Sequence, residues 1–134
     1  MANKEVYNVV RNCLVRACGL DAEEIEPDKT LFHDLDIDSI DMLEIIFAIE
    51  REFTISIKFG EFENRAIEIT PGPFEEKSIV TEAGIETLKQ LMPEIPPANF
   101  NSGMSVQDIP MLMTVESLCR IVDHKLAEKR DQAG

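Results

Sequence analysis

The segment 39–53, Ser-Ile-Asp-Met-Leu-Glu-Ile-Ile-Phe-Ala-Ile-Glu-Arg-Glu-Phe, constrains the fold of this chain more than any other feature. Its apolar residues recur at helical spacing, but they cover two faces of the predicted helix. One face carries Leu43, Ile46 and Phe47, and the other carries Met42, Ile45 and Ile49. Because one apolar stripe is enough to pack a helix against a core, the second stripe indicates a surface for a partner or a ligand.

Two further segments show the same helical spacing. In residues 3–18 the apolar positions lie three and four apart, and Gly19 follows where a left-handed cap is common. In residues 114–130, Thr114 is a suitable N-cap, and the basic last turn suits the negative end of a helix dipole. We expect the last helix to pack against the first and against the helix 39–53.

The stretch 20–38 between the first two helices is acidic and is broken by Pro27, which favours a loop. Some of its residues are nevertheless large and apolar, and such residues need burial. They are Ile25, Leu31, Phe32 and Leu35. We therefore expect a long loop that packs on the core.

The middle of the chain, residues 54–113, shows weaker patterns. Alternation of apolar and polar residues in 55–59 and 67–69 predicts two short strands of a hairpin. Helical spacing in 81–92 predicts an additional helix. The length of 134 residues fits one domain, so we expect a single domain over 1–134.

The formal charge of −13 comes from 26 acidic and 13 basic residues. The segment 21–53 alone holds twelve acids against Lys29 and Arg51, so the acidity is concentrated there. Nucleic acid phosphates and anionic membrane surfaces would repel such a chain, and a basic protein is the expected partner.

The N-terminal residues lack the apolar core of a signal peptide, and no apolar run approaches the roughly 20 residues of a membrane span. We therefore expect a cytoplasmic protein without an integral membrane segment. The three cysteines, Cys13, Cys18 and Cys119, form no CxxC pair and fit reduced core positions. His33 and His124 show no metal-ligand spacing with them, so no metal site is expected.

The sequence Asp38-Ser39-Ile40-Asp41 lies where a loop turns into the helix 39–53. Ser39 should present its hydroxyl beside the free N–H groups of the first turn, which suits an esterified phosphate. The helix terminus would stabilise that phosphate by about 0.3–1 kcal/mol, and the neighbouring acids would repel it by a comparable screened amount, so only a covalent bond would hold it. The alternative is that Ser39 is an ordinary N-cap residue.

The run 31–53, Leu-Phe-His-Asp-Leu-Asp-Ile-Asp-Ser-Ile-Asp-Met-Leu-Glu-Ile-Ile-Phe-Ala-Ile-Glu-Arg-Glu-Phe, resembles the acyl carrier proteins. Their signature is an Asp-Ser-Leu-like tripeptide that opens a second helix rich in acidic and apolar residues, and Ile40 here replaces the commoner Leu. The resemblance covers residues 3–57 and resumes at 114–129. It implies an all-α, four-helix bundle with a long insertion between the second and last helices.

The resemblance also implies a function. Ser39 would carry a covalent 4'-phosphopantetheine arm, with Asp38 and Ile40 beside it, and the arm would hold an acyl chain as a thioester. The protein would then be a carrier without catalytic residues, serving fatty acid, specialised lipid or polyketide-type biosynthesis. The sequence of the second helix is similar to that of the carriers that deliver very long acyl chains to lipid A.

The implied partners are a phosphopantetheinyl transferase and acyl-ACP synthase, ketosynthase or acyltransferase enzymes with basic patches, which a monomeric carrier would visit in turn. The residues implied at the partner interface are Asp36, Asp41, Met42, Glu44, Glu50 and Glu52.

The insertion, at about 54–113, departs from this family, whose second and last helices are joined by a short loop and a small third helix. We expect 105–112 to replace that third helix. The remainder would form either a lobe over the cargo or a surface insertion without a separate function.

Other functions fit the residues less well than the carrier does. Asp34-x-Asp36-x-Asp38 mimics the start of an EF-hand loop, but Ser39 stands where that loop needs Gly and Ile45 where it needs Glu. A serine hydrolase would need an elbow such as GxSxG, which is absent around Ser39. An unmodified acidic protein-interaction module stays open as the alternative.

Overall fold

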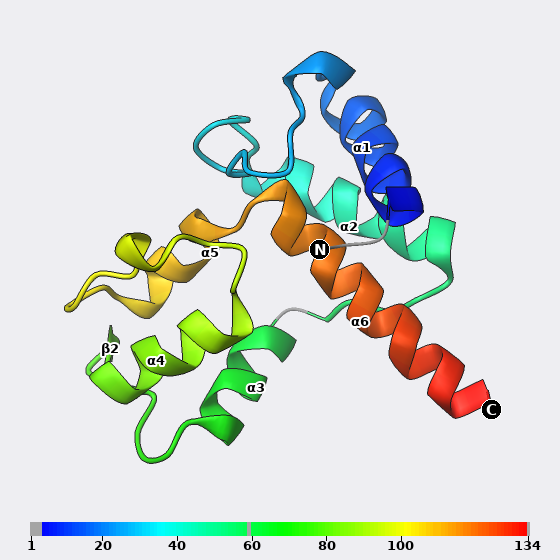
Figure 1. The fold of residues 1–134 in the computed structure, drawn as a ribbon. Helices are drawn as coiled ribbons and strands as arrows, with labels where there is room; N and C mark the ends of the chain where they lie inside the picture. The colour runs from blue at the N-terminus through cyan, green and yellow to red at the C-terminus, as the bar shows by residue number, and fades with distance from the viewer. Residues whose placement is uncertain (1–3, 59, 134) are drawn as a thin grey trace. The chain divides into compact units, whose positions relative to one another are not determined.

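The computed structural model of the chain describes residues 4–58 and 60–133. It is mostly helical, with one small hairpin, as the sequence predicts (Figure 1). The elements are α1 Lys4–Cys18, η1 Ala22–Glu24, α2 Ser39–Phe53, α3 Glu61–Ile69, β1 Glu75–Glu76, β2 Ile79–Val80, α4 Glu82–Leu91, η2 Pro97–Asn99, η3 Val106–Asp108, α5 Ile109–Leu112 and α6 Val115–Ala133. They form two compact units, Met1–Ile57 with Met113–Gly134, and Lys58–Leu112.

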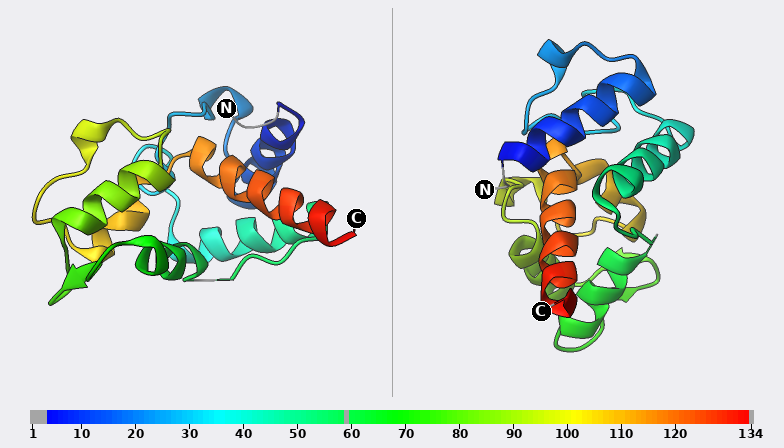
Figure 2. Two further views of the ribbon diagram at one scale, coloured as in Figure 1. Left: turned by 60° about the horizontal axis from the view of Figure 1, so that its bottom comes forward. Right: turned by 90° about the vertical axis from the view of Figure 1, so that its right-hand side faces the viewer.

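The first unit is built on three long helices, α1, α2 and α6. Helix α1 packs against both of the others, so the two ends of the chain share one core (Figures 1 and 2). The helices predicted at 39–53 and 114–130 are confirmed, and so is the first one from Lys4 onward. Asn3, where that helix was predicted to begin, lies outside the described residues.

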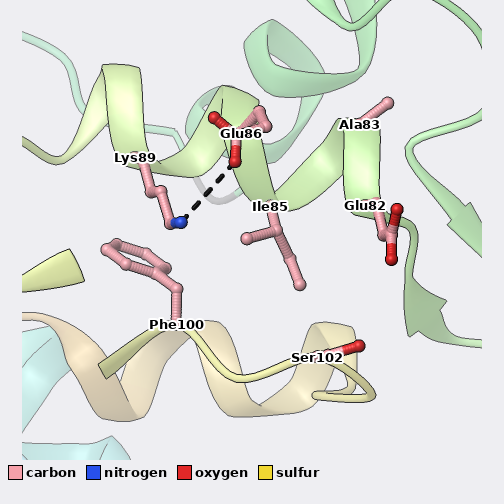
Figure 3. Close-up of a pocket in the computed structure, with 7 residues that line it drawn as sticks. All are labelled: Glu82, Ala83, Ile85, Glu86, Lys89, Phe100 and Ser102. Carbon is pink, nitrogen blue, oxygen red and sulfur yellow. Dashed lines mark ion pairs between the residues drawn. The ribbon is translucent and has the colours of Figure 1, made fainter. Parts of the chain in front are cut away.

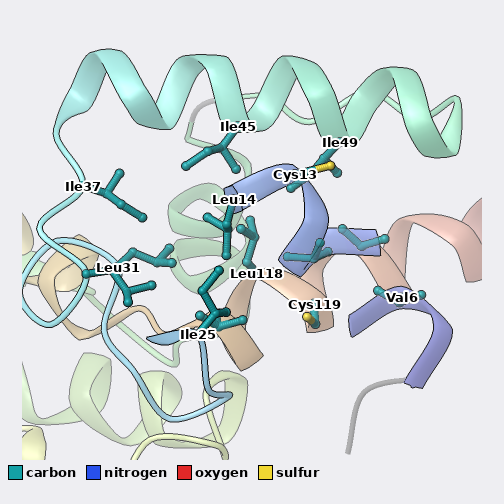
Figure 4. Packing of buried hydrophobic residues seen from close by; sticks show 14 residues of the cluster. Val6, Cys13, Leu14, Ile25, Leu31, Ile37, Ile45, Ile49, Leu118 and Cys119 are labelled. Carbon is teal, nitrogen blue, oxygen red and sulfur yellow. The ribbon is translucent and has the colours of Figure 1, made fainter. Parts of the chain in front are cut away.

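The core of this unit is contributed by all three helices and by the loop that precedes α2. Ile45 and Ile49 of α2 point toward Leu14 and Cys13 of α1, beside Leu118 of α6 (Figure 4). The remaining buried residues of the cluster are Val6, Val10, Ile25, Leu31, Leu35, Ile37, Val115, Cys119 and Val122. The predicted packing of the acidic loop on the core is thus confirmed, and it holds the entrance to α2 in place.

Backbone hydrogen bonds attach the same loop to the start of α6. The amide of Leu31 donates to the carbonyl of Met113 at 3.0 Å, and the amide of Val115 donates to the carbonyl of Lys29 at 3.0 Å. A local turn closes between Thr30 and Asp34, where the amide of Thr30 donates to Asp34 Oδ2 at 2.9 Å. This hydrogen bond lowers the pKa of the exposed Asp34 carboxyl. The loop is therefore fixed along its length despite its acidic composition.

The three cysteines are free thiols, as the sequence predicts. Cys13 and Cys119 are buried, and Cys18 is half-buried. Burial raises the pKa of Cys13, and it raises the pKa of Cys119 to about 12. These side chains therefore act as small neutral core residues.

The second unit contains the hairpin, but not where the sequence predicts it. Residues 61–69 form helix α3, so the strand predicted at 67–69 is wrong, and 55–57 form no regular element. Phe59, the end of the other predicted strand, lies outside the described residues. The observed strands are β1 and β2, which pair antiparallel through a two-residue turn at Lys77 and Ser78. Both turn residues have positive φ, 52° and 69°, although neither is glycine.

Helix α4 confirms the additional helix predicted at 81–92. The hydroxyl of Thr81 caps it by accepting a hydrogen bond from the amide of Gly84 at 3.0 Å. A side chain at Gly84 would collide with the carbonyl of Phe74 and with Val80, which requires glycine there. The predicted helix at 105–112 is present as η3 followed by α5, and a reciprocal Ser105–Asp108 capping box opens it.

Candidate functional site

The N-terminus of α2 is closed by a reciprocal pair of acidic side chains. Asp38 is the N-cap, in extended conformation, and its Oδ1 accepts a hydrogen bond from the amide of Asp41 at 2.7 Å. In return, Asp41 Oδ2 accepts from the amide of Asp38 at 3.4 Å. This capping box satisfies two backbone donors of the first turn, and it fixes the point at which the helix starts.

Ser39 is the first residue of α2 and is exposed. The alternative in which Ser39 itself caps the helix is wrong, because Asp38 makes the cap bond. Within residues 4–58 and 60–133, the Ser39 hydroxyl has no hydrogen-bond partner. Because this exposed hydroxyl makes no hydrogen bond within the fold, it is free to react with a group that reaches it from solvent.

The surroundings of Ser39 are strongly acidic. Asp36 and Asp38 are exposed, and Asp36 has a left-handed backbone with φ 54°, which aspartate tolerates better than most residues. Burial, followed by the charges of Asp41, Glu44 and Asp38, raises the pKa of Cys18 to about 11. The Cys18 thiol is therefore neutral and a poor nucleophile at physiological pH.

The predicted interface residues of α2 have different environments. Glu44 is exposed, and Met42 is half-buried and packs against the core. Glu50 Oε2 accepts a hydrogen bond from the amide of Ile57 at 2.9 Å, so its carboxylate also fixes the end of α2. Glu52 forms an ion pair with Arg16 of α1 at 3.3 Å. Their role at an interface stays a prediction.

An outer face of α2, made of Ile40, Leu43, Glu44, Phe47 and Arg51, is exposed along its length. Its apolar members are large, with exposed fractions of 69% for Ile40, 37% for Leu43 and 54% for Phe47. The second apolar stripe in the sequence signals this surface, although Leu43, Phe47 and Arg51 were not among the predicted interface residues. The sequence places Ile46 in the same stripe as Leu43 and Phe47, but in the structure Ile46 is buried.

A groove of about 390 Å³ lies within the second unit, between α4 and the segment that follows η2 (Figure 3). Ile85 and Phe100 form its apolar part, and an ion pair between Glu86 and Lys89 at 3.5 Å lies along one wall. The remaining lining residues are Glu82, Ala83 and Ser102. Its mixed charges mark no particular ligand chemistry.

Among the residues that the structure describes, no group of three or more His, Cys, Asp or Glu side chains is placed to hold a metal ion. Over the same residues, no helix has the length and apolar character needed to cross a bilayer.

Comparison with known proteins identifies the family. The family model for the phosphopantetheine attachment site matches residues 8–68. The acyl carrier protein of Picosynechococcus sp. is 36% identical over 55 residues, which are 41% of this chain and 68% of that protein. The acyl carrier protein of Helicobacter hepaticus is 32% identical over 59 residues, which are 44% of this chain and 78% of that protein. The acyl carrier protein AcpXL of Rhizobium meliloti is 36% identical over 56 residues, which are 42% of this chain and 59% of that protein.

The chain belongs to the acyl carrier protein family. It is a carrier rather than an enzyme, and it holds acyl groups on a phosphopantetheine arm for the enzymes of fatty acid or lipid biosynthesis.

Proposed function

We propose that Ser39 is the residue that bears the phosphopantetheine arm. The observation that carries the proposal is the exposed, unbonded Ser39 hydroxyl at the first position of α2. Ser39 also lies inside the residues that match the attachment-site model, which are 8–68. Asp38 and Ile40 are its direct neighbours, and both are exposed, so a transferase can approach from either side.

The protein's own contribution to the attachment is an oxygen atom in an accessible place. In the transferase, Ser39 Oγ would attack the phosphorus of coenzyme A that bears the pantetheine arm; the new P–O bond would form as the pyrophosphate P–O bond breaks, the serine proton would pass to a base, and adenosine 3',5'-bisphosphate would leave. The capping box keeps the helix terminus closed beside Ser39. Once attached, the arm supplies a terminal thiol that holds the acyl group as a thioester. A bound phosphate gains about 0.3–1 kcal/mol from the helix terminus, and nearby carboxylates offset that gain, so the covalent bond is essential.

We propose that the partner enzymes meet the carrier through basic patches. The transferase and the acyl-ACP synthase, ketosynthase or acyltransferase enzymes would face the exposed carboxylates around Ser39, with Asp36, Asp41, Met42, Glu44, Glu50 and Glu52 at or near the contact. Such contacts form quickly and weaken as salt rises, which suits a carrier that visits several enzymes. We also propose that it works as a cytoplasmic monomer and that 1–134 acts as one carrier domain.

The biosynthetic pathway is a further part of the proposal. Fatty acid, specialised lipid and polyketide-type synthesis all use carriers of this chemistry. The α2 sequence is similar to that of carriers of very long acyl chains, and one of the relatives is named AcpXL, so specialised lipid synthesis is one of the candidate pathways.

The test of this function detects the acyl thioester as well as the attached arm. The protein, loaded by a broad phosphopantetheinyl transferase and coenzyme A, is incubated with a fatty acid, ATP and an acyl-ACP synthase. We expect an added acyl mass that neutral hydroxylamine removes, and none on Ser39→Ala. An acyl mass that hydroxylamine leaves in place would contradict the thioester. A wild type that takes up neither arm nor acyl group would favour the unmodified interaction module.

A further inference from the structure

The outer face of α2 changes charge along its length. On this face the acidic side chain is that of Glu44, in the first half of the helix, and Arg51 lies in the last turn. With about 100° per residue, Glu44, Phe47 and Arg51 all project within one narrow sector of the helix. From the Ser39 end, a partner that lies along α2 therefore meets the apolar side chain of Ile40, then Leu43 beside the carboxylate of Glu44, then Phe47, and finally the cation of Arg51.

The two charges of the face are separated along the helix. Arg51 lies seven residues beyond Glu44, which is about 10 Å along a helix that rises about 1.5 Å per residue. This separation exceeds the screening length of about 8 Å at physiological salt. Glu44 therefore offsets the field of Arg51 only in part, and Asp38 and Asp36, which lie farther away, offset it less.

The carboxylates that adjoin Arg51 are directed to other groups. Glu50 accepts the amide of Ile57 at 2.9 Å, and Glu52 pairs with Arg16 at 3.3 Å. The Arg51 guanidinium makes no hydrogen bond or ion pair with any residue of 4–58 or 60–133. Its charge is available to a partner.

We propose that Arg51 is a specificity-determining residue of the carrier and that an enzyme which accepts the loaded protein places a carboxylate opposite it. The same enzyme presents basic groups to the Ser39 end and an apolar pocket to Phe47. Opposite charges at the two ends of the face allow only one direction of docking, because the reversed direction brings like charges together. The docked direction places Ser39, and hence the cargo, at the enzyme's active site.

The inference rests on the proposed function, since it concerns the enzymes that accept the loaded arm. A structural role for Arg51 is the competing explanation, because a cation in the last turn also stabilises a helix by interacting with its dipole. The dipole effect would appear in the free energy of unfolding. Partner specificity would appear in kcat/KM and in its dependence on salt.

The experiment uses the full-length protein, loaded with an arm and an acyl group, and two probe enzymes that accept the wild type: a ketosynthase and an acyltransferase. Arg51→Glu is compared with Arg51→Lys, and with Arg130→Glu as a control. Arg130 is an exposed cation near the end of α6, so the control has the same change in net charge. Thermal unfolding of each variant shows whether the fold is kept.

We expect Arg51→Glu to lower kcat/KM by about five- to tenfold at low salt through KM, with a smaller loss at high salt. Arg51→Lys and Arg130→Glu should remain within about twofold of the wild type. Equal kcat/KM values for Arg51→Glu and Arg130→Glu with both enzymes would overturn the inference, as would a loss that salt does not reduce. A wild type that takes up no arm in the mass spectrum would instead overturn the proposed function.

Discussion

Asp38 and Asp41 hold each other across Ser39: the amide of Asp41 donates to Asp38 Oδ1 at 2.7 Å, and the amide of Asp38 donates to Asp41 Oδ2 at 3.4 Å. The helix terminus is therefore satisfied without the intervening serine. Two acids do the structural work that a serine at this place often does, and this leaves the Ser39 hydroxyl for chemistry.

Removing the cap should destabilise the protein. Asp38→Ala loses the bond to the amide of Asp41, and we expect the free energy of unfolding to fall by about 1 kcal/mol in denaturant titration. Asp38→Asn keeps an acceptor oxygen, so its free energy of unfolding should fall by less. Equal losses in the two variants would contradict the capping role of Asp38.

The two faces of α2 should respond differently to truncation. Ile49 is fully buried, so Ile49→Ala should cost about 2–5 kcal/mol of unfolding free energy. Phe47 is 54% exposed, and Phe47→Ala should change stability by no more than about 0.5 kcal/mol. A large loss from Phe47→Ala in chemical denaturation would show that the outer face is part of the core.

The C-terminal end of α2 is tied to α6 by Lys129. Its Nζ donates to the carbonyl of Thr54 at 3.0 Å and to that of Phe53 at 3.4 Å. Lys129→Ala should lower the free energy of unfolding by about 0.5–1 kcal/mol, whereas the neighbouring Arg130→Ala should have less effect. No difference between the two in thermal unfolding would mean that these exposed bonds contribute nothing.

Most of the helices of this fold could be predicted from the sequence, because their apolar spacing is long and regular. The start of α2 could also be predicted, since a loop signal changes to helical spacing at Ser39. The role of Asp38 as the cap could not, because Asp and Ser are both good caps and adjacent residues cannot be ranked by type alone.

The sequence pattern places the hairpin wrongly for three physical reasons. Ile67 and Ile69 alternate like a strand, but Phe62, Ala66 and Thr70 recur at helical spacing, with Ala66 and Thr70 buried. The true strands contain two residues each, which is too short for a periodic signal. Their turn also lacks glycine, the usual sign of positive φ.

Ionisation of the Cys18 thiol should lower the free energy of unfolding at alkaline pH. Burial raises the pKa of Cys18 from 9.0 to about 11, so the folded protein binds this proton more tightly than the unfolded chain. The stabilisation is complete below the unfolded pKa and is lost as pH rises through the folded value. Between pH 9 and 11, the wild type should lose more unfolding free energy than Cys18→Ala; parallel curves in denaturant titrations would contradict the shift.

The central claim is that Ser39 bears the arm, and the most direct measurement is peptide mapping after incubation with coenzyme A and a broad phosphopantetheinyl transferase. Ser56→Ala is the matched control, because Ser56 is an exposed serine of the same unit. We predict one phosphopantetheine per chain, on the peptide that contains Ser39, in the wild type and in Ser56→Ala but not in Ser39→Ala. An arm on another residue, or on Ser39→Ala to the same extent, would contradict the account.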